Sequence, residues 1–328
     1  MSDLRGHVAV VAGATRGAGR GIARALGEAG ATVYCTGRSV EGDPSAYGRP
    51  ETIGETAQLV THAGGNGIAV RVDHTSEPDV RELFVRVEKE HHRLDVLVTS
   101  VGGEDPLLAG WSAFWETDVS RGADVLRNAV FSHVLTARYA APIMVARKRG
   151  LIVEITEGDF LGGSGNILHD LVKSSGKTLA LRMAEELRPY GVCAMSVTPG
   201  FLRSEAMLEA FAVTEANWRD GGAKDKHFLH SETPLFIGRA VTALVADADV
   251  MRHTGDLTSS WELSREYGFT DADGSRPDWG EHWKDVMIEM PAIADGLGRQ
   301  VKWLDRLARR AEGYLQKEAM RVSRKPAR

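Results

Sequence analysis

The sequence is poor in cysteine and carries no large excess of charge of either sign. Its 328 residues include two cysteines, and the formal net charge is −5 with a pI near 6.1. Cys35 and Cys193 lie in runs that predict interior strands, so we expect two buried thiols and a reducing, cytoplasmic environment. The mildly acidic balance gives no basis for a nucleic-acid partner.

Long apolar runs and metal-binding clusters are also missing from the pattern. No apolar run approaches the roughly 18 residues that a membrane-spanning helix needs, and Met1–Arg5 does not resemble a signal peptide, so no membrane is expected. No Cys/His cluster has the spacing of zinc ligands, which predicts no metal site. The remaining composition, 43% hydrophobic and 26% charged, is typical of a globular α/β protein.

The most informative stretch lies near the N-terminus. The β-branched run Val8–Val11 predicts a buried strand, and Ile22–Leu26 begins a helix. Between them Gly13, Gly17 and Gly19 are spaced GxxxGxG. Glycines at such a turn let a pyrophosphate approach the backbone, and the helix N-terminus adds N–H donors and a positive dipole end. The stretch therefore predicts a dinucleotide-binding turn.

Strands and helices alternate along the chain. Further strands are predicted at 31–36, 68–72, 94–98, 151–155, 192–197 and 256–263, with helical patterns between most of them. Because parallel strands are joined by right-handed crossovers, this order predicts a single domain of the α/β class with a doubly wound parallel sheet.

The glycine spacing and this alternation resemble the short-chain dehydrogenase/reductase family. The resemblance covers about residues 6–267, and the segment ending in Tyr267-Gly268 is similar to a branch related to the mammalian dehydrogenase/reductase member 1. It implies a Rossmann-type NADP(H)-binding domain over 1–268 with a substrate loop at 201–235. It also implies a homo-dimer or homo-tetramer. The extension 269–328, with a helical apolar stripe over 298–321, is expected to pack on the domain or on another subunit.

The end of the second predicted strand bears on the cofactor. It reads Thr36-Gly37-Arg38 and lacks the acidic residue that NAD-preferring folds place against the ribose 2′-hydroxyl. Arg38, with Arg16 in the glycine turn, offers cationic forks for a 2′-phosphate, which favours NADP(H) over NAD. Asp73 is implied to contact the adenine but is equally suited to cap a helix. The other cofactor contacts implied by the family are Thr15, Gly102, Lys173, Pro199 and Gly200.

The catalytic positions depart from the family pattern. Ketone-reducing members use a serine together with Tyr-x-x-x-Lys, in which the tyrosine delivers a proton and the lysine lowers the pKa of the tyrosine. Here the lysine falls at Lys173, but His169 stands where the tyrosine is expected. The serine is replaced by Thr156 or Glu157. These four residues are the catalytic candidates of an altered site.

Three functions stay open on this evidence. The first is an NADPH-dependent reductase of a carbonyl or imine in a small, specialised metabolite, with His169 as proton donor and Thr156 as its hydrogen-bonding partner. The second is acid/base chemistry (cyclisation, dehydration, epimerisation or a coupled reduction–cyclisation) by His169 with Glu157 or Asp170. The third is a catalytically silent cofactor-binding subunit in which His169 is a packing residue.

Overall fold

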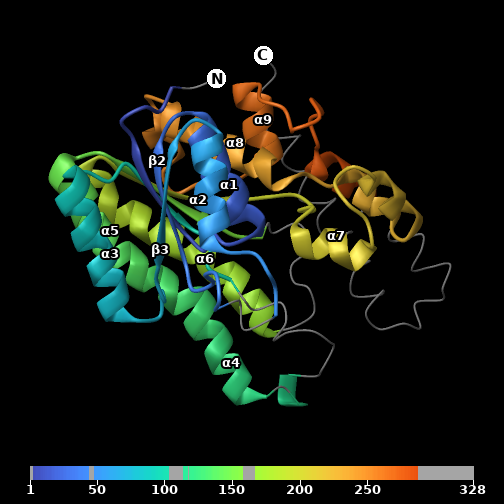
Figure 1. Cartoon of the computed structure of the whole chain (residues 1–328), viewed down its shortest axis with the longest axis horizontal. Helices are drawn as coiled ribbons and strands as arrows, with labels where there is room; N and C mark the ends of the chain where they lie inside the picture. Colours follow the sequence, from blue (N-terminus) through green and yellow to red (C-terminus); the bar gives the residue numbers. More distant parts are fainter. Residues whose placement is uncertain (1–2, 44–47, 103–113, 117, 158–166, 287–328) are drawn as a thin grey trace, which may run out of the picture.

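The computed structural model describes residues 3–43, 48–102, 114–116, 118–157 and 167–286 (Figure 1). These residues form a seven-stranded parallel sheet in the order β3-β2-β1-β4-β5-β6-β7. The strands are β1 Val8–Ala12, β2 Thr32–Gly37, β3 Asn66–Arg71, β4 Val96–Thr99, β5 Gly150–Ile155, β6 Val192–Thr198 and β7 Leu257–Ser259. The order reverses between β1 and β4, which confirms the predicted doubly wound sheet.

Helices cover both faces of the sheet, and one apolar core lies under each layer. The first face carries α1 (Gly17–Glu28), α2 (Ile53–His62), α8 (Pro234–Ala246) and α9 (Ser260–Tyr267). The second carries α3 (Glu77–His91), α5 (Ser132–Arg147) and α6 (Ile167–Leu187). Because both faces are covered, β1 and β6 are buried along their whole length and consist of continuous apolar or small residues.

Shorter elements connect these layers. They are α4 (Val119–Leu126), α7 (Glu205–Phe211) and the turns η2 (Phe114–Glu116), η3 (Arg127–Phe131), η4 (Arg188–Tyr190), η5 (Trp218–Ala223), η6 (Lys226–His230) and η7 (Val250–His253). A π-helical turn, η3, joins α4 to α5, so the two form one continuous helix. Figure 1 shows α4 projecting beyond the sheet.

This helix corrects one expectation. Among the described residues, Ser120–Arg147 spans 28 residues with an 18-residue window of mean hydropathy 1.2, so this helix is long and apolar enough to cross a membrane by length and composition alone. Half of that window is buried inside the protein. Leu135, Ala140 and Met144 of α5 pack in the core under the sheet, which is the behaviour of a core helix. The helix is therefore only weak evidence for a membrane span.

The last predicted strand is wrong in its second half. β7 ends at Ser259, and α9 begins at the next residue. Ser259 Oγ accepts from the backbone N–H of Glu262, whose carboxylate accepts in return from the backbone N–H of Ser259 (3.1 Å). This capping box satisfies two donors at the helix start, and the Ser-x-x-Glu spacing in the sequence is its signal.

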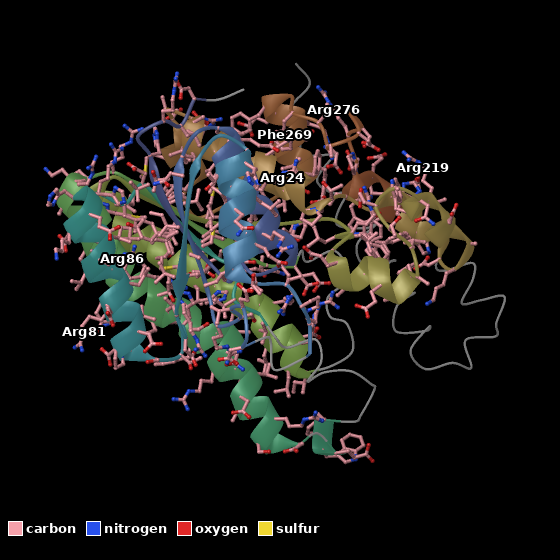
Figure 2. The ribbon with its side chains drawn as sticks, in the orientation of Figure 1. Arg24, Arg81, Arg86, Arg219, Phe269 and Arg276 are labelled. Carbon is pink, nitrogen blue, oxygen red and sulfur yellow. The ribbon has the colours of Figure 1, made fainter. Side chains whose placement is uncertain are left out.

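The described part of the C-terminal extension packs on the domain. The Asp271 carboxylate accepts from the backbone N–H of Thr233 (2.9 Å) and from its hydroxyl. Arg219 of the substrate loop reaches Asp273 (3.2 Å), and Arg276 donates to the carbonyl oxygen of Gly268 (2.8 Å); both arginines are labelled in Figure 2. The extension thus contacts both the sheet domain and the loop. The predicted stripe at 298–321 lies outside the described residues.

Both cysteines are buried free thiols, as the sequence predicts. Burial raises the pKa of Cys193 to about 11 and that of Cys35 to about 12. Neither side chain is therefore a ready thiolate nucleophile at neutral pH.

Candidate functional site

The carboxyl ends of the parallel strands meet at one edge of the sheet. The glycine turn follows β1, Arg38 follows β2, Gly102 follows β4, and Pro199 follows β6. This edge therefore collects most of the predicted site residues at the point where the strand order reverses, which is the usual ligand crevice of open α/β sheets.

The glycine turn is too tight for side chains. Gly13 and Gly17 have φ of +83° and +54°, in the left-handed region that favours glycine. A Cβ atom on Gly13 would lie 2.3 Å from the carbonyl oxygen of Ser100, and one on Gly19 would lie 2.2 Å from that of Gly13. Thr15 is buried within the same turn. The backbone itself therefore forms the surface of the turn.

A carboxylate lies on the N-terminus of α1. The backbone N–H of Gly17 donates to Glu205 Oε2 at 2.8 Å, and Arg20 Nε lies 3.8 Å from Glu205 Oε1. Glu205 belongs to α7, far away in the sequence. An anionic side chain at this place shows that the turn accepts negative charge, so the residues present fit the phosphates of a dinucleotide.

The two predicted phosphate-binding arginines differ in their surroundings. Arg38 is exposed, whereas Arg16 is partly buried with its Nε 3.4 Å from Glu51 Oε2. Glu51 is itself buried and accepts a 2.6 Å hydrogen bond from Arg49. Within the described residues, Nε and Nη2 of Arg16 make no hydrogen bond. Burial lowers the pKa of Arg16, and the neighbouring Glu51 opposes that effect.

Asp73 does not cap α3, the alternative role that the sequence left open, because the N-cap residue of α3 is Ser76. Its Oδ1 accepts from the backbone N–H of Thr75 (2.9 Å) and from the Thr75 hydroxyl (2.8 Å). Burial opposes its ionisation, but these hydrogen bonds outweigh burial, so the pKa of Asp73 is below its ordinary value. The carboxylate is ordered just before α3, at the same edge of the sheet as the glycine turn.

A buried pair beneath the Gly102 segment was not predicted. His133 Nε2 lies 2.9 Å from the carbonyl oxygen of Val101, and His133 Nδ1 lies 2.7 Å from Glu154 Oε2. A carbonyl oxygen only accepts, so Nε2 carries a proton, and a second proton is shared between Nδ1 and the carboxyl group. The signal in the sequence is a glutamate inside the apolar run of β5.

His169 is placed between two carboxylates. Its Nε2 lies 3.2 Å from Glu157 Oε2 and its Nδ1 lies 3.8 Å from Asp170 Oδ1, while its side chain is only 17% exposed. Desolvation disfavours the charge of Glu157, but the His169 hydrogen bond and the charges of Lys173 and Lys177 outweigh it. The pKa of Glu157 is therefore below its ordinary value, and an ionised carboxylate faces the imidazole.

Thr156 and Glu157 have different surroundings. The Thr156 hydroxyl donates to the backbone carbonyl of Lys173 at 2.8 Å, and the residue is buried against α6. Glu157 is the one of the two whose side chain reaches His169. His169 and Lys173 lie one turn apart on α6, as their spacing predicts.

The segment after β6 is held by a residue that the sequence did not indicate. The backbone N–H of Gly200 donates to Oε2 of the buried Glu232 at 2.9 Å. Phe201 packs edge-on against Trp279 of the extension, with ring centroids 5.6 Å apart. Within the described ranges, no group of three or more His, Cys, Asp or Glu side chains is arranged to hold a metal ion.

Comparisons with known proteins agree with this architecture. The model of the short chain dehydrogenase family matches residues 7–214. The chain belongs to the short-chain dehydrogenase/reductase family and is an oxidoreductase of that fold.

Its relatives indicate the branch. The chain is 36% identical over 278 residues to human dehydrogenase/reductase SDR family member 1, which covers 83% of this chain and 85% of the relative. It is 29% identical over 210 residues to the 7alpha-hydroxysteroid dehydrogenase of Clostridium sardiniense, covering 64% and 76%. The chain is therefore a member of the dehydrogenase/reductase member 1-like branch.

Solved structures share the fold. A short chain dehydrogenase from Mycobacterium thermoresistibile superimposes with a TM-score of 0.69 at 20% identity, covering 85% of this chain and 93% of that one. A metagenomic short-chain oxidoreductase, solved in complex with NADP, gives a TM-score of 0.58 at 26% identity, covering 75% and 93%.

Proposed function

We propose that the protein is an NADPH-dependent reductase that acts on a carbonyl or imine of a small, specialised metabolite and uses His169 as proton donor. The observation that carries this proposal is the place of His169. It lies one turn before Lys173 on α6, with its ring 3.2 Å from an ionised Glu157. This is the position at which the family places its proton-donating tyrosine.

The residues divide the chemistry between them. The nicotinamide cofactor, when bound, supplies the hydride for the reduction. The imidazolium form of His169 donates a proton to the substrate oxygen or nitrogen, since imidazole titrates near pH 6.5 and exchanges protons readily at neutral pH. Glu157 orients the ring and stabilises its charge. Lys173 would hold the nicotinamide ribose.

The test compares His169→Phe with His62→Phe, a control at an exposed histidine at the end of α2. NADPH binding is followed by fluorescence, and turnover by absorbance with a panel of carbonyl and imine compounds. Loss of a general acid typically costs a factor of about 10²–10⁴, so His169→Phe is expected to bind NADPH normally and lose at least about 100-fold in turnover. Undiminished turnover in His169→Phe would contradict the proposal.

The pair of His169 and Glu157 favours a second candidate. A histidine beside a carboxylate can also take and return a proton without net redox change, as in a cyclisation, dehydration or epimerisation. That enzyme would convert substrate without consuming NADPH. Binding of NADPH without conversion of any compound is the result expected of a silent cofactor-binding subunit.

The cofactor preference is proposed to be NADP(H). Arg16 and Arg38 supply cationic donors near the end of β2, and a related oxidoreductase was solved with NADP. Charge-assisted hydrogen bonds contribute about 1.5–3 kcal/mol each, so Arg38→Ala is expected to weaken NADPH binding about 10- to 100-fold. NADH binding should be nearly unchanged, because NADH lacks the 2′-phosphate. Equal losses for the two nucleotides would contradict this assignment.

We further propose a homo-dimer or homo-tetramer formed through the long helices. Four apolar side chains are between 42% and 52% exposed: Phe131 at the end of η3, Val134 in α5, and Leu171 and Leu181 on α6. A second copy of the chain would cover them. Phe131→Glu with Leu171→Glu should reduce the mass measured by light scattering, and an unchanged mass would place the interface elsewhere.

A further inference from the structure

Glu232 is a buried acid at the end of the substrate loop. It precedes α8 by two residues and is 1% exposed. Its Oε2 accepts from the backbone N–H of Gly200 (2.9 Å) and from the hydroxyl of Ser260 at the start of α9 (2.6 Å). Its Oε1 is also buried, and among the described residues it has no hydrogen-bond partner. An ionised carboxylate would leave that oxygen without solvation.

Among the described residues, no cation forms an ion pair with this acid. The guanidinium of Arg203 is used by the Glu215 carboxylate (2.8 Å) and by the backbone and hydroxyl oxygens of Ser231. Asp271, from the extension, adds negative charge. Burial raises the pKa of Glu232 to about 8, with Asp271 adding to this effect, while the hydrogen bonds from Ser260 and Gly200 and the charge of Arg203 oppose it. The group is therefore mainly neutral at pH 7.

The backbone of Glu232 joins the two ends of the substrate loop. Its N–H donates to the carbonyl oxygen of Phe201 (2.9 Å), and its carbonyl oxygen accepts from the N–H of Arg203 (2.8 Å). Trp279 of the extension also lies close to Gly200. A Cβ atom on Gly200 would lie 2.7 Å from the Trp279 Cβ and 3.1 Å from Glu232 Oε2. Gly200 is thus in close contact with both the acid and the extension.

We propose that Glu232, as a neutral carboxylic acid, is a positioning residue that holds the Pro199–Gly200 segment against the nicotinamide and keeps the substrate loop closed. This inference rests on the proposed function, since it requires the cofactor at this edge of the sheet. Ionisation of Glu232 would draw water to Oε1 and loosen both the loop ends and the Trp279 contact. Cofactor binding then weakens at alkaline pH, while the proton-donating residues on α6 stay in place.

The first experiment measures the Kd and the KM for NADPH between pH 6 and pH 10. The variants are Glu232→Gln, Glu232→Ala and the exposed control Glu281→Gln. In the wild type and the control, both constants should rise above about pH 8, by up to about tenfold per pH unit if only the protonated form binds. Glu232→Gln should match the wild type at pH 7 within about twofold and show no alkaline rise, because its amide stays neutral and still accepts from Gly200.

Glu232→Ala should bind NADPH weakly at every pH. The proposal is overturned if Glu232→Gln keeps the alkaline rise, or if it binds as weakly at pH 7 as Glu232→Ala does. A uniform loss in both variants would indicate general damage to the fold and would equally reject a positioning role through the neutral acid.

A second measurement separates this inference from the proposed function. Limited proteolysis of the nucleotide-free protein at pH 7 and pH 9.5 reports closure of the loop at 201–235 without any cofactor. The wild type should be cut faster in this loop at pH 9.5, relative to a reference cleavage elsewhere, and Glu232→Gln should not. If NADPH fails to bind but this difference appears, the proposed cofactor is wrong and the loop-closing role of Glu232 stands. Equal cleavage ratios in both proteins would reject that role.

Discussion

Replacing His133 with phenylalanine should destabilise the protein strongly. Glu154 is completely buried in β5, and His133 is its partner at 2.7 Å. Together the two groups hold one shared proton and are neutral as a pair. Phenylalanine fills much of the imidazole volume but removes the only ring nitrogen facing the carboxyl group. A buried carboxylate without its partner is left behind, with a carbonyl oxygen of Val101 that has lost its donor.

The expected loss is about 3–5 kcal/mol, the usual cost of breaking a buried pair by removing one partner. This is a large part of the roughly 5–15 kcal/mol that stabilises a folded domain. With an unfolding entropy of about 2.1 cal/mol/K for each of the 328 residues, this loss corresponds to a decrease in Tm of roughly 4–7 °C. Urea unfolding followed by circular dichroism measures the free energy directly.

Two further variants isolate the pair from general packing effects. In Glu154→Gln the amide N–H can donate to a neutral His133 Nδ1, so the loss should stay below about 1 kcal/mol. In the double variant His133→Phe, Glu154→Leu no charge is buried, and much of the lost stability should return. If His133→Phe costs less than about 1 kcal/mol, or if the double variant is no more stable than His133→Phe, the shared-proton reasoning is refuted.

Three other predictions follow from close contacts. Gly21→Ala should destabilise the fold by about 1–3 kcal/mol in urea unfolding, because the added Cβ would lie 1.9 Å from the carbonyl oxygen of Pro234 and force α1 and α8 apart; an unchanged midpoint would contradict this. Glu205→Gln should lower the Kd for NADPH about three- to tenfold, since a neutral amide competes less with phosphate for the N–H of Gly17; a weaker or unchanged affinity would argue against this competition. Ser259→Ala should cost about 1 kcal/mol through loss of the helix cap, and thermal unfolding without a decrease in Tm would show that the cap contributes little.

The fold could be predicted because each strand carries its own signal. Buried parallel strands such as β1 and β6 are continuous apolar runs, and the glycine turn is dictated by local backbone geometry at Gly13 and Gly17. The error at β7 arose because an apolar pattern was extended through Ser259, although a capping box marks the start of a helix there. The Ser-x-x-Glu spacing of this capping box is visible in the sequence alone.

The supporting contacts of the site could not be predicted in the same way. Glu154 meets His133 only because α5 packs across β5, and Glu232 meets Gly200 only because the substrate loop returns to its own start. Glu205 and Gly17 are separated by 188 positions in the sequence. Pairings of this kind depend on tertiary packing, and a single sequence contains no periodicity that reports them.

The meeting of both loop ends at Glu232 has an evolutionary consequence. Since residues 201–203 and 232 are joined by backbone hydrogen bonds, the segment between them is a loop whose two ends lie side by side. Lengthening such a loop costs little free energy of folding, because the closure entropy grows only with the logarithm of loop length. Mutation and insertion within 206–231, which leave the Glu205 contact with Gly17 in place, can therefore reshape this loop while the sheet stays unchanged. The same fold can in this way acquire new substrates through changes in this one loop.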